Sequence, residues 1–234
     1  EAPSLDTLHN KVRNDLNKAY LESRDRAAWE RTPNRRKMFH EFYYATGLSD
    51  SAIEESRQRI LTCLTNLLAS RSFRDAIAAP YVEARQVDEF VTFDIDGTPI
   101  YAMPDLLYRL GDETWTVTDW KTGREDVDWE QLAVYALYVS ERHGLQNTSI
   151  QARIEWLATG TADEYSFSEG DLRACRDRIL DSVSIMQTYL ADPAVNAPRD
   201  RAAFPLREDT SKCRNCKFYE LNEEEIASRS SGPF

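Results

Sequence analysis

The sequence predicts an α/β protein with a central mixed sheet, flanked by helices and preceded by a helical part. Residues 100–121 form two strand-like arms around a turn signal at Gly111-Asp112. The second arm is rich in β-branched and aromatic residues, including Trp115, Val117 and Trp120, which favour strands. Segments with the 3.6-residue apolar period of helices lie on both sides of these arms.

Composition is typical of a folded globular protein. The chain has 234 residues, of which 41% are hydrophobic and 29% charged. We predict one domain, with a helical part over residues 4–80, an α/β core over 81–190 and an irregular segment over 191–234. No apolar run approaches the roughly 20 residues of a membrane span. The chain has no export signal and begins at Glu1 rather than Met, as expected of a fragment or processed product. Cytoplasmic location is the default expectation.

Charge is unevenly distributed. The net charge of −11 argues against non-specific nucleic-acid binding, and acidic residues outnumber basic ones over residues 83–130. A site that collects carboxylates accepts phosphate only when a cation is bound there. Basic residues gather instead at residues 35–37 and at Arg207, Lys212, Arg214 and Lys217, where a solvated surface is the favoured interpretation.

The first 80 residues predict three helices, over residues 4–22, 35–44 and 51–70, with a loop over 25–33. In the first helix, Leu5, Leu8, Val12 and Leu16 form one apolar stripe. His9 borders this stripe. On the pattern alone, a structural role for such a histidine is favoured over a role as a ligand.

Strands and a crossover helix follow. Residues 86–95 alternate in polarity before a tight turn at Asp96-Gly97, and with 100–110 and 114–121 they predict an antiparallel meander. A helix over 128–143 then connects to a strand over 149–158, which we expect to rejoin the sheet. A long helix over 168–190 closes the core. Cys63 and Cys175 lie at helical core positions.

The hairpin brings three charged side chains together. Side chains alternate along a strand, so Asp119 and Lys121 point to one face, and the turn near Gly111 brings Asp105 roughly opposite residues 117–119. An ordinary charged surface hairpin is the alternative. Because Asp105 precedes two leucines and Asp119 lies beside Trp120, the sequence favours charges that need a partner or a metal.

These residues resemble a known family. Pro104-Asp105 followed by Asp119-Trp120-Lys121 resembles the PD-(D/E)XK nuclease signature. The continuation to Gly123, followed by Gln131-Leu-Ala-Val-Tyr135, is similar to the RecB-like branch, which includes RecB and AddB nuclease domains and CRISPR-adaptation nucleases. The predicted αβββαβ order matches the restriction-endonuclease-like core of that superfamily.

The resemblance implies a metal site and a catalytic lysine. The metal ligands would be His9 on a helix ahead of the sheet, Asp105, Asp119 and the backbone carbonyl of Trp120. Hard cations prefer oxygen ligands, so Mg²⁺ or Mn²⁺ is implied. Lys121 would orient or deprotonate the attacking water or stabilise the transition state, a contribution of about 10²–10⁴ in rate for a general acid–base group. Gln131 and Tyr135 would hold the lysine and the DNA backbone.

The C-terminal segment departs from the family pattern. Many relatives hold a [4Fe–4S] cluster with four cysteines, three of them near the C-terminus. Here Cys213 and Cys216 are present, but Asn222 occupies the third position and no cysteine lies near the N-terminus. We therefore do not expect a cluster, and a vestigial CxxC loop is favoured over a zinc site.

Three functions remain open from the sequence. The first is a metal-dependent DNA nuclease that hydrolyses phosphodiester bonds in repair, recombination or defence, with DNA as substrate and a helicase or similar protein as partner. The second is a catalytically silent DNA-binding or scaffolding module of the same fold. The third is an acidic α/β interaction domain in which the motif string is coincidental.

Overall fold

A computed structural model describes residues 2–84, 92–111, 114–123, 129–144, 150–206, 209–210, 213 and 219–230. The first residue of the predicted helix over 128–143 and part of the predicted strand over 86–95 lie outside these residues. The chain divides into two compact units, Glu1–Arg178 and Ile179–Phe234, and each is described by itself.

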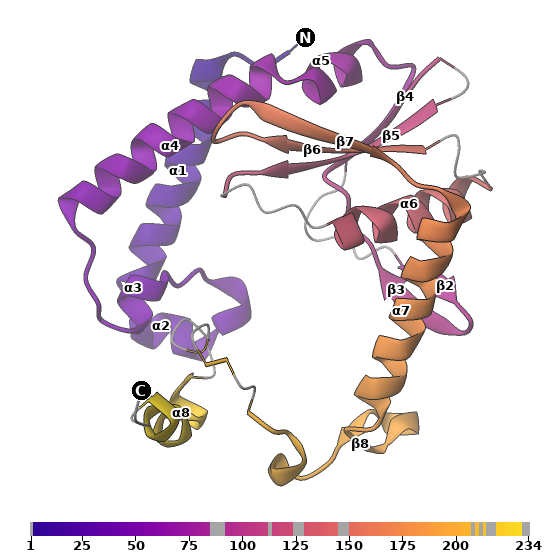
Figure 1. Ribbon diagram of the computed structural model, residues 1–234. Helices are drawn as coiled ribbons and strands as arrows, with labels where there is room; N and C mark the ends of the chain where they lie inside the picture. The colour runs from indigo at the N-terminus through magenta and orange to yellow at the C-terminus, as the bar shows by residue number, and fades with distance from the viewer. Residues whose placement is uncertain are drawn as a thin grey trace. The chain divides into compact units, whose positions relative to one another are not determined.

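The first unit begins with a helical part (Figure 1). Its elements are α1 (Leu5–Ser23), α2 (Arg26–Arg31), the 3-10 turn η1 (Pro33–Arg35), α3 (His40–Tyr43), α4 (Asp50–Ala69) and α5 (Arg71–Ala78). Ser4 caps α1, since its side chain accepts a hydrogen bond from the Thr7 amide. Cys63 on α4 is buried, which confirms the predicted core position.

Three details of the helical part differ from the prediction. The expected loop over 25–33 contains α2, because Asp25 caps it by accepting a hydrogen bond from the Ala28 amide at 3.0 Å. Of the helix expected over 35–44, only the last turn forms, as α3 (His40–Tyr43). Ala45, just after it, has a positive φ of 53° that ends the helix. The helix expected over 51–70 begins at Asp50, because Ser49 caps it by accepting a hydrogen bond from the Ala52 amide.

The core of the first unit is a five-stranded mixed sheet in the order β1-β4-β5-β6-β7. Its strands are β1 (Tyr81–Ala84), β4 (Leu106–Leu110), β5 (Thr114–Lys121), β6 (Ile150–Trp156) and β7 (Thr161–Ser166). Neighbours are antiparallel except β5 and β6, which are parallel and connected through α6 (Trp129–His143). The predicted crossover and the central mixed sheet are confirmed.

The predicted meander is wrong in its first strand. β2 (Thr92–Ile95) and β3 (Thr98–Tyr101) form a separate two-stranded hairpin, and β1 takes the place beside β4. The turn at Asp96-Gly97 is as predicted, with φ 51° and 80° at these two residues, conformations that Asp and Gly tolerate better than other residues. β1 was missed because it has only four residues, and β7 because it is mostly polar and exposed.

Helices cover both faces of the sheet. Figure 1 shows α6 on one side and α5 on the other. The face toward α6 carries Val117, Ala152 and Ile154, all buried. The face toward α5 is polar and includes the buried side chains of Thr118 and Arg153. Because side chains alternate along β5, successive residues point in turn toward α6 and toward α5.

The C-terminal end of the first unit and the second unit share the long helix α7 (Glu169–Gln187). Cys175 on α7 is buried, as predicted. The segment over 191–234 is not wholly irregular, because it contains β9 (Ala197–Pro198), which pairs with β8 (Leu190–Asp192), and α8 (Glu223–Ser230). Short 3-10 turns η3 (Pro193–Val195), η4 (Arg201–Ala203) and η6 (Tyr219–Leu221) occupy part of the remainder.

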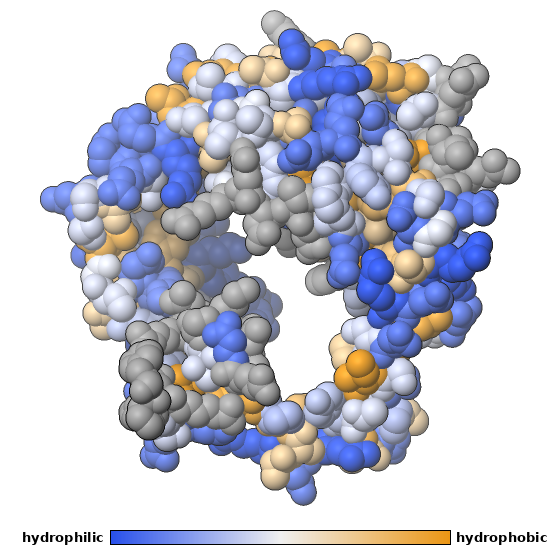
Figure 2. All heavy atoms as spheres, viewed as in Figure 1, coloured by the Kyte–Doolittle hydropathy of each residue, from blue (hydrophilic) through white to orange (hydrophobic). Residues whose placement is uncertain are grey.

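The surface is mostly polar. Hydrophilic residues predominate on the face seen in Figure 2, with hydrophobic residues scattered among them. Among the helices that the structure describes, none has the length and apolar character needed to cross a membrane.

Candidate metal and catalytic site

Strand pairing brings the two predicted carboxylates to one place. Leu106 of β4 pairs with Thr118 of β5, so Asp105, the residue before β4, lies level with Asp119. The Trp120 amide donates a hydrogen bond to Asp105 Oδ2 at 2.8 Å, which ties the end of β4 to β5. Asp105 and Asp119 therefore lie side by side at the end of two paired strands, as the sequence predicts.

A chain of polar contacts leads from Asp119 to α6. Lys121 Nζ lies 2.7 Å from Asp119 Oδ2 and donates a hydrogen bond to Gln131 Oε1 at 2.9 Å. Gln131 Nε2 in turn donates to the Tyr135 hydroxyl at 2.7 Å. Gln131 and Tyr135 are four residues apart and share one face of α6. The helix thus holds the lysine from the side opposite to the carboxylate.

Asp119 is the most enclosed member of the site. Its side chain is only 6% exposed, and within the described part of the chain its Oδ2 atom accepts no hydrogen bond, although it forms the ion pair with Lys121. Burial raises the pKa of Asp105 above its usual value; the Trp120 amide acts against this, the negative charge of Asp119 adds to it, and Lys121 opposes it. Asp105 therefore lies in an environment that disfavours its charged form.

The donor set fits a divalent cation. A bound cation would favour the ionised form of Asp105 and would give Asp119 Oδ2 a further partner. On a strand, the N–H and C=O of one residue point toward the same neighbouring strand. Because the Trp120 amide faces Asp105, the Trp120 carbonyl is on that side as well. Asp105, Asp119 and this carbonyl are the oxygens that would hold Mg²⁺ or Mn²⁺.

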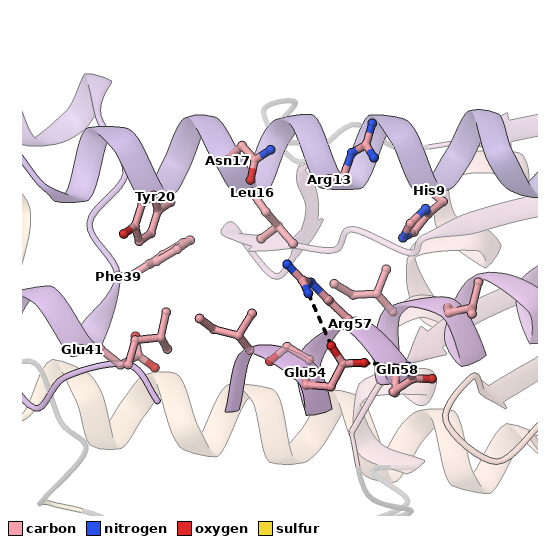
Figure 3. A pocket seen from close by; sticks show the side chains of 15 residues that line it. His9, Arg13, Leu16, Asn17, Tyr20, Phe39, Glu41, Glu54, Arg57 and Gln58 are labelled. Atoms are coloured by element: carbon pink, nitrogen blue, oxygen red, sulfur yellow. Dashed lines mark hydrogen bonds and ion pairs between the residues drawn. The ribbon is translucent and has the colours of Figure 1, made fainter. Parts of the chain in front are cut away.

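His9 lies in the first half of α1. It lines a groove of about 900 Å³ together with residues of α1 and α4, among them Arg13, Tyr20 and Arg57 (Figure 3). Across the described residues, no group of three or more His, Cys, Asp or Glu side chains is close enough to hold a metal. The structure therefore brings Asp105, Asp119, Lys121, Gln131 and Tyr135 together, and it does not bring His9 to them.

The CxxC motif belongs to the second unit. Cys213 is a half-buried free cysteine, and Cys216 lies outside the described residues. Asn222, at the position where relatives carry a third cysteine, accepts a hydrogen bond from Arg201 Nη2 at 3.0 Å. This hydrogen bond connects Asn222 to η4 within the same unit.

One buried residue beside the site was missed by sequence reasoning. Glu155 on β6 is 3% exposed and accepts hydrogen bonds from the Trp120 indole at 2.7 Å and from the Ser72 amide at 2.9 Å. In the sequence, Glu155 follows Gln151 and Arg153 on the polar face of an alternating strand, a pattern that does not distinguish it from a solvated residue. Its partners come from β5 and α5, and the pairing of distant segments is not visible in local pattern.

Comparison with known families adds to this geometry. A family model for the PD-(D/E)XK nuclease superfamily matches residues 5–221. The chain belongs to the PD-(D/E)XK nuclease superfamily. The match includes all five residues that the structure brings together, and the mixed sheet flanked by helices is consistent with the fold of this superfamily. No curated protein matched the chain.

Proposed function

We propose that this protein is a metal-dependent deoxyribonuclease of the RecB-like type, which hydrolyses phosphodiester bonds. Membership of a nuclease superfamily indicates a phosphodiester hydrolase and a nucleic-acid substrate. The observation that carries the proposal is a connected series of contacts at the end of β5. The Trp120 amide donates to Asp105, and Lys121 contacts both Asp119 and Gln131. The order Asp119-Trp-Lys-Thr-Gly123 followed by Gln131 and Tyr135 is the basis for the RecB-like type.

Each residue has a distinct part in this proposal. Asp105, Asp119 and the Trp120 carbonyl would hold Mg²⁺ or Mn²⁺, which, when bound, supplies Lewis acidity and lowers the pKa of water. Lys121 Nζ donates hydrogen bonds and offers a positive charge where negative charge develops on the phosphate. With one N–H donated to Gln131 Oε1 and the ammonium group paired with Asp119, Lys121 has a further donor for water or a phosphate oxygen. Tyr135 fixes the Gln131 amide.

The biological setting follows only from resemblance. RecB-like nucleases suggest a role in DNA repair, recombination or defence, with a helicase or similar protein delivering a DNA end. The high acidity of the chain agrees with a substrate that is recruited through a bound cation or a partner rather than by general attraction.

The test is DNA cleavage by the purified chain. End-labelled single- and double-stranded DNA is incubated with wild type, Lys121→Ala and Lys11→Ala, each with Mn²⁺, Mg²⁺ or EDTA. Lys11 is an exposed lysine that pairs with Asp15 on α1 and serves as the matched control. We expect cleavage that requires the metal, is retained in Lys11→Ala and is lost in Lys121→Ala. Equal cleavage by wild type and Lys121→Ala would refute the role of this lysine.

A catalytically silent module of the same fold is the second candidate. The observation in its favour is the location of His9, which lies in the groove beside α4 and not in a ligand cluster with Asp105 and Asp119. A silent module predicts Mn²⁺ binding or DNA binding without turnover under every metal condition. Turnover in the cleavage assay would eliminate it.

A further inference from the structure

Trp120 on β5 is hydrogen-bonded both to Asp105, just before β4, and to Glu155 on β6. Its neighbours Asp119 and Lys121 point toward α6, so its own side chain points toward α5. Its backbone amide lies in the plane of the sheet and donates to Asp105 Oδ2 at 2.8 Å. Its indole Nε1 donates to Glu155 Oε2 at 2.7 Å. The orientation of Trp120 therefore affects the positions of Asp105 and Asp119, the two carboxylates of the candidate metal site.

Both oxygens of Glu155 are engaged. Oε2 accepts from the Trp120 indole, and Oε1 accepts from the Ser72 amide in the first turn of α5 at 2.9 Å. Carboxylates are favoured near the first turn of a helix, where amide protons point outward. With one oxygen held by α5 and the other by the indole, the Glu155 side chain has little freedom. It can hold the Trp120 ring in one orientation.

Burial of Glu155 needs an explanation. The residue is 3% exposed, and a carboxylate out of water is costly unless it is well hydrogen-bonded. A neutral side chain would fill the same space without this cost. A carboxylate gives the indole a charge-assisted and therefore shorter and stronger hydrogen bond. The structure thus buries the Glu155 carboxylate, despite its desolvation cost, at a place where it immobilises Trp120, the residue between Asp119 and Lys121.

We propose that Glu155 is a positioning residue for the metal site and acts through the Trp120 indole. It touches neither metal nor substrate and lies on the opposite face of the sheet. By holding the ring, it sets the backbone of Trp120, whose amide orients Asp105 and whose carbonyl is a candidate ligand. Groups that orient metal ligands typically contribute about 10–100-fold to metal affinity. The inference rests on the proposed metal site.

The test is a double-mutant cycle read out by Mn²⁺ affinity of the full chain, measured by titration calorimetry. Glu155→Gln removes the charge of the acceptor, and Trp120→Phe removes the indole N–H but keeps the ring and the backbone. We expect each single variant to weaken Mn²⁺ binding about tenfold. The double variant should bind about as tightly as either single variant, because both changes remove the same hydrogen bond.

A matched control separates positioning from stability. Trp156 on β6 donates to Asp163 Oδ2 on β7 at 2.8 Å, a second tryptophan–carboxylate hydrogen bond in the same sheet. Asp163→Asn should lower the melting temperature without changing Mn²⁺ affinity. If Glu155→Gln and Trp120→Phe lower only the melting temperature and bind Mn²⁺ as wild type does, the positioning role is wrong.

Failure of the inference can be told apart from failure of the proposed function. Asp105→Ala is included in the same titration. If wild type binds Mn²⁺ and Asp105→Ala does not, the metal site holds, and the Glu155 and Trp120 variants then decide the positioning role alone. If wild type itself binds no Mn²⁺, both the metal site and the role of Glu155 are refuted.

Discussion

Lys121 donates a hydrogen bond to Gln131 across the gap between β5 and α6, with 2.9 Å between Nζ and Oε1. The lysine also lies 2.7 Å from Asp119, so it is held between a carboxylate and an amide. This pair of contacts joins the strand that carries the candidate metal ligands to the helix that follows it. It explains how Gln131, in the first turn of α6, can affect the catalytic role proposed for Lys121.

Gln131→Leu is predicted to slow DNA cleavage while leaving the metal bound. The substitution keeps the volume of the side chain but removes the acceptor that orients Lys121, and a misplacement of about 1 Å can cost about 10²-fold in rate. Single-turnover cleavage and Mn²⁺ titration of the same sample provide the measurement. Tyr135→Phe should have a smaller effect in the same direction, because it acts on Lys121 only through Gln131. Full activity in Gln131→Leu would contradict the prediction.

Mn²⁺ is predicted to raise the melting temperature of wild type and not that of Asp105→Ala. A ligand that binds only the folded state stabilises it by about 2.7 kcal/mol at a concentration of 100 times Kd. Thermal unfolding with and without Mn²⁺, with Ca²⁺-free buffer and EDTA as the baseline, measures the shift. Asp15→Ala, an exposed aspartate on α1, is the control and should keep the full shift. An equal shift in Asp105→Ala would place the metal elsewhere.

Arg153 is predicted to be a major contributor to stability. It is 1% exposed on the face of the sheet toward α5, donates to Ser72 Oγ and the Tyr108 hydroxyl, and pairs with Glu164 at 2.9 Å. Arg153→Met leaves Glu164 and the two hydroxyls without this partner. We expect a loss of about 3 kcal/mol in the free energy of unfolding, because the buried Ser72 and Tyr108 hydroxyls lose a charged hydrogen-bond donor.

Urea unfolding measures the effect of Arg153→Met, with Arg57→Met as the control. Arg57 pairs with Glu54 on α4, and both side chains are more than half exposed. An exposed pair of this kind contributes about 0–1 kcal/mol. A loss at Arg153 no larger than that at Arg57 would show that the buried network does not stabilise the fold.

His143 is predicted to make the fold sensitive to mild acid. Its ring stacks on Trp115 with 3.9 Å between the ring centroids. Burial lowers the pKa of His143, and the charges of Arg142 and Arg109 lower it further. The unfolded chain, with a histidine pKa of about 6.5, therefore binds this proton more readily than the folded chain does.

The sign of the pH effect follows from linkage. Stability from neutral His143 is fully present above the unfolded pKa of about 6.5, and it is lost as the pH falls below that value. His143→Phe keeps the ring against Trp115 and removes the titration. We expect urea unfolding between pH 7.5 and 5.5 to show a smaller loss of stability in the variant than in wild type. Identical losses of stability in the two proteins would show that His143 does not cause the sensitivity to acid.

The sequence by itself determined the candidate site. Alternation along a strand put Asp119 and Lys121 on one face, the turn at Gly111 put Asp105 opposite, and helical spacing put Gln131 and Tyr135 on one side of α6. All of these relations are local, because they depend on the repeat of one element or on one turn. The crossover from β5 to β6 was also predictable, since a helix between two strands favours parallel pairing.

Only the tertiary structure decided which segments pair at a distance. β1 has only four residues and β7 is mostly polar, so their place in the sheet depends on the strands they border rather than on their own pattern. The location of His9 depends on how α1 packs against α4. Glu155 finds its partners on α5 and β5, far away in sequence. Local periodicity specifies which face a side chain occupies, whereas long-range hydrogen bonds and burial specify what it meets there.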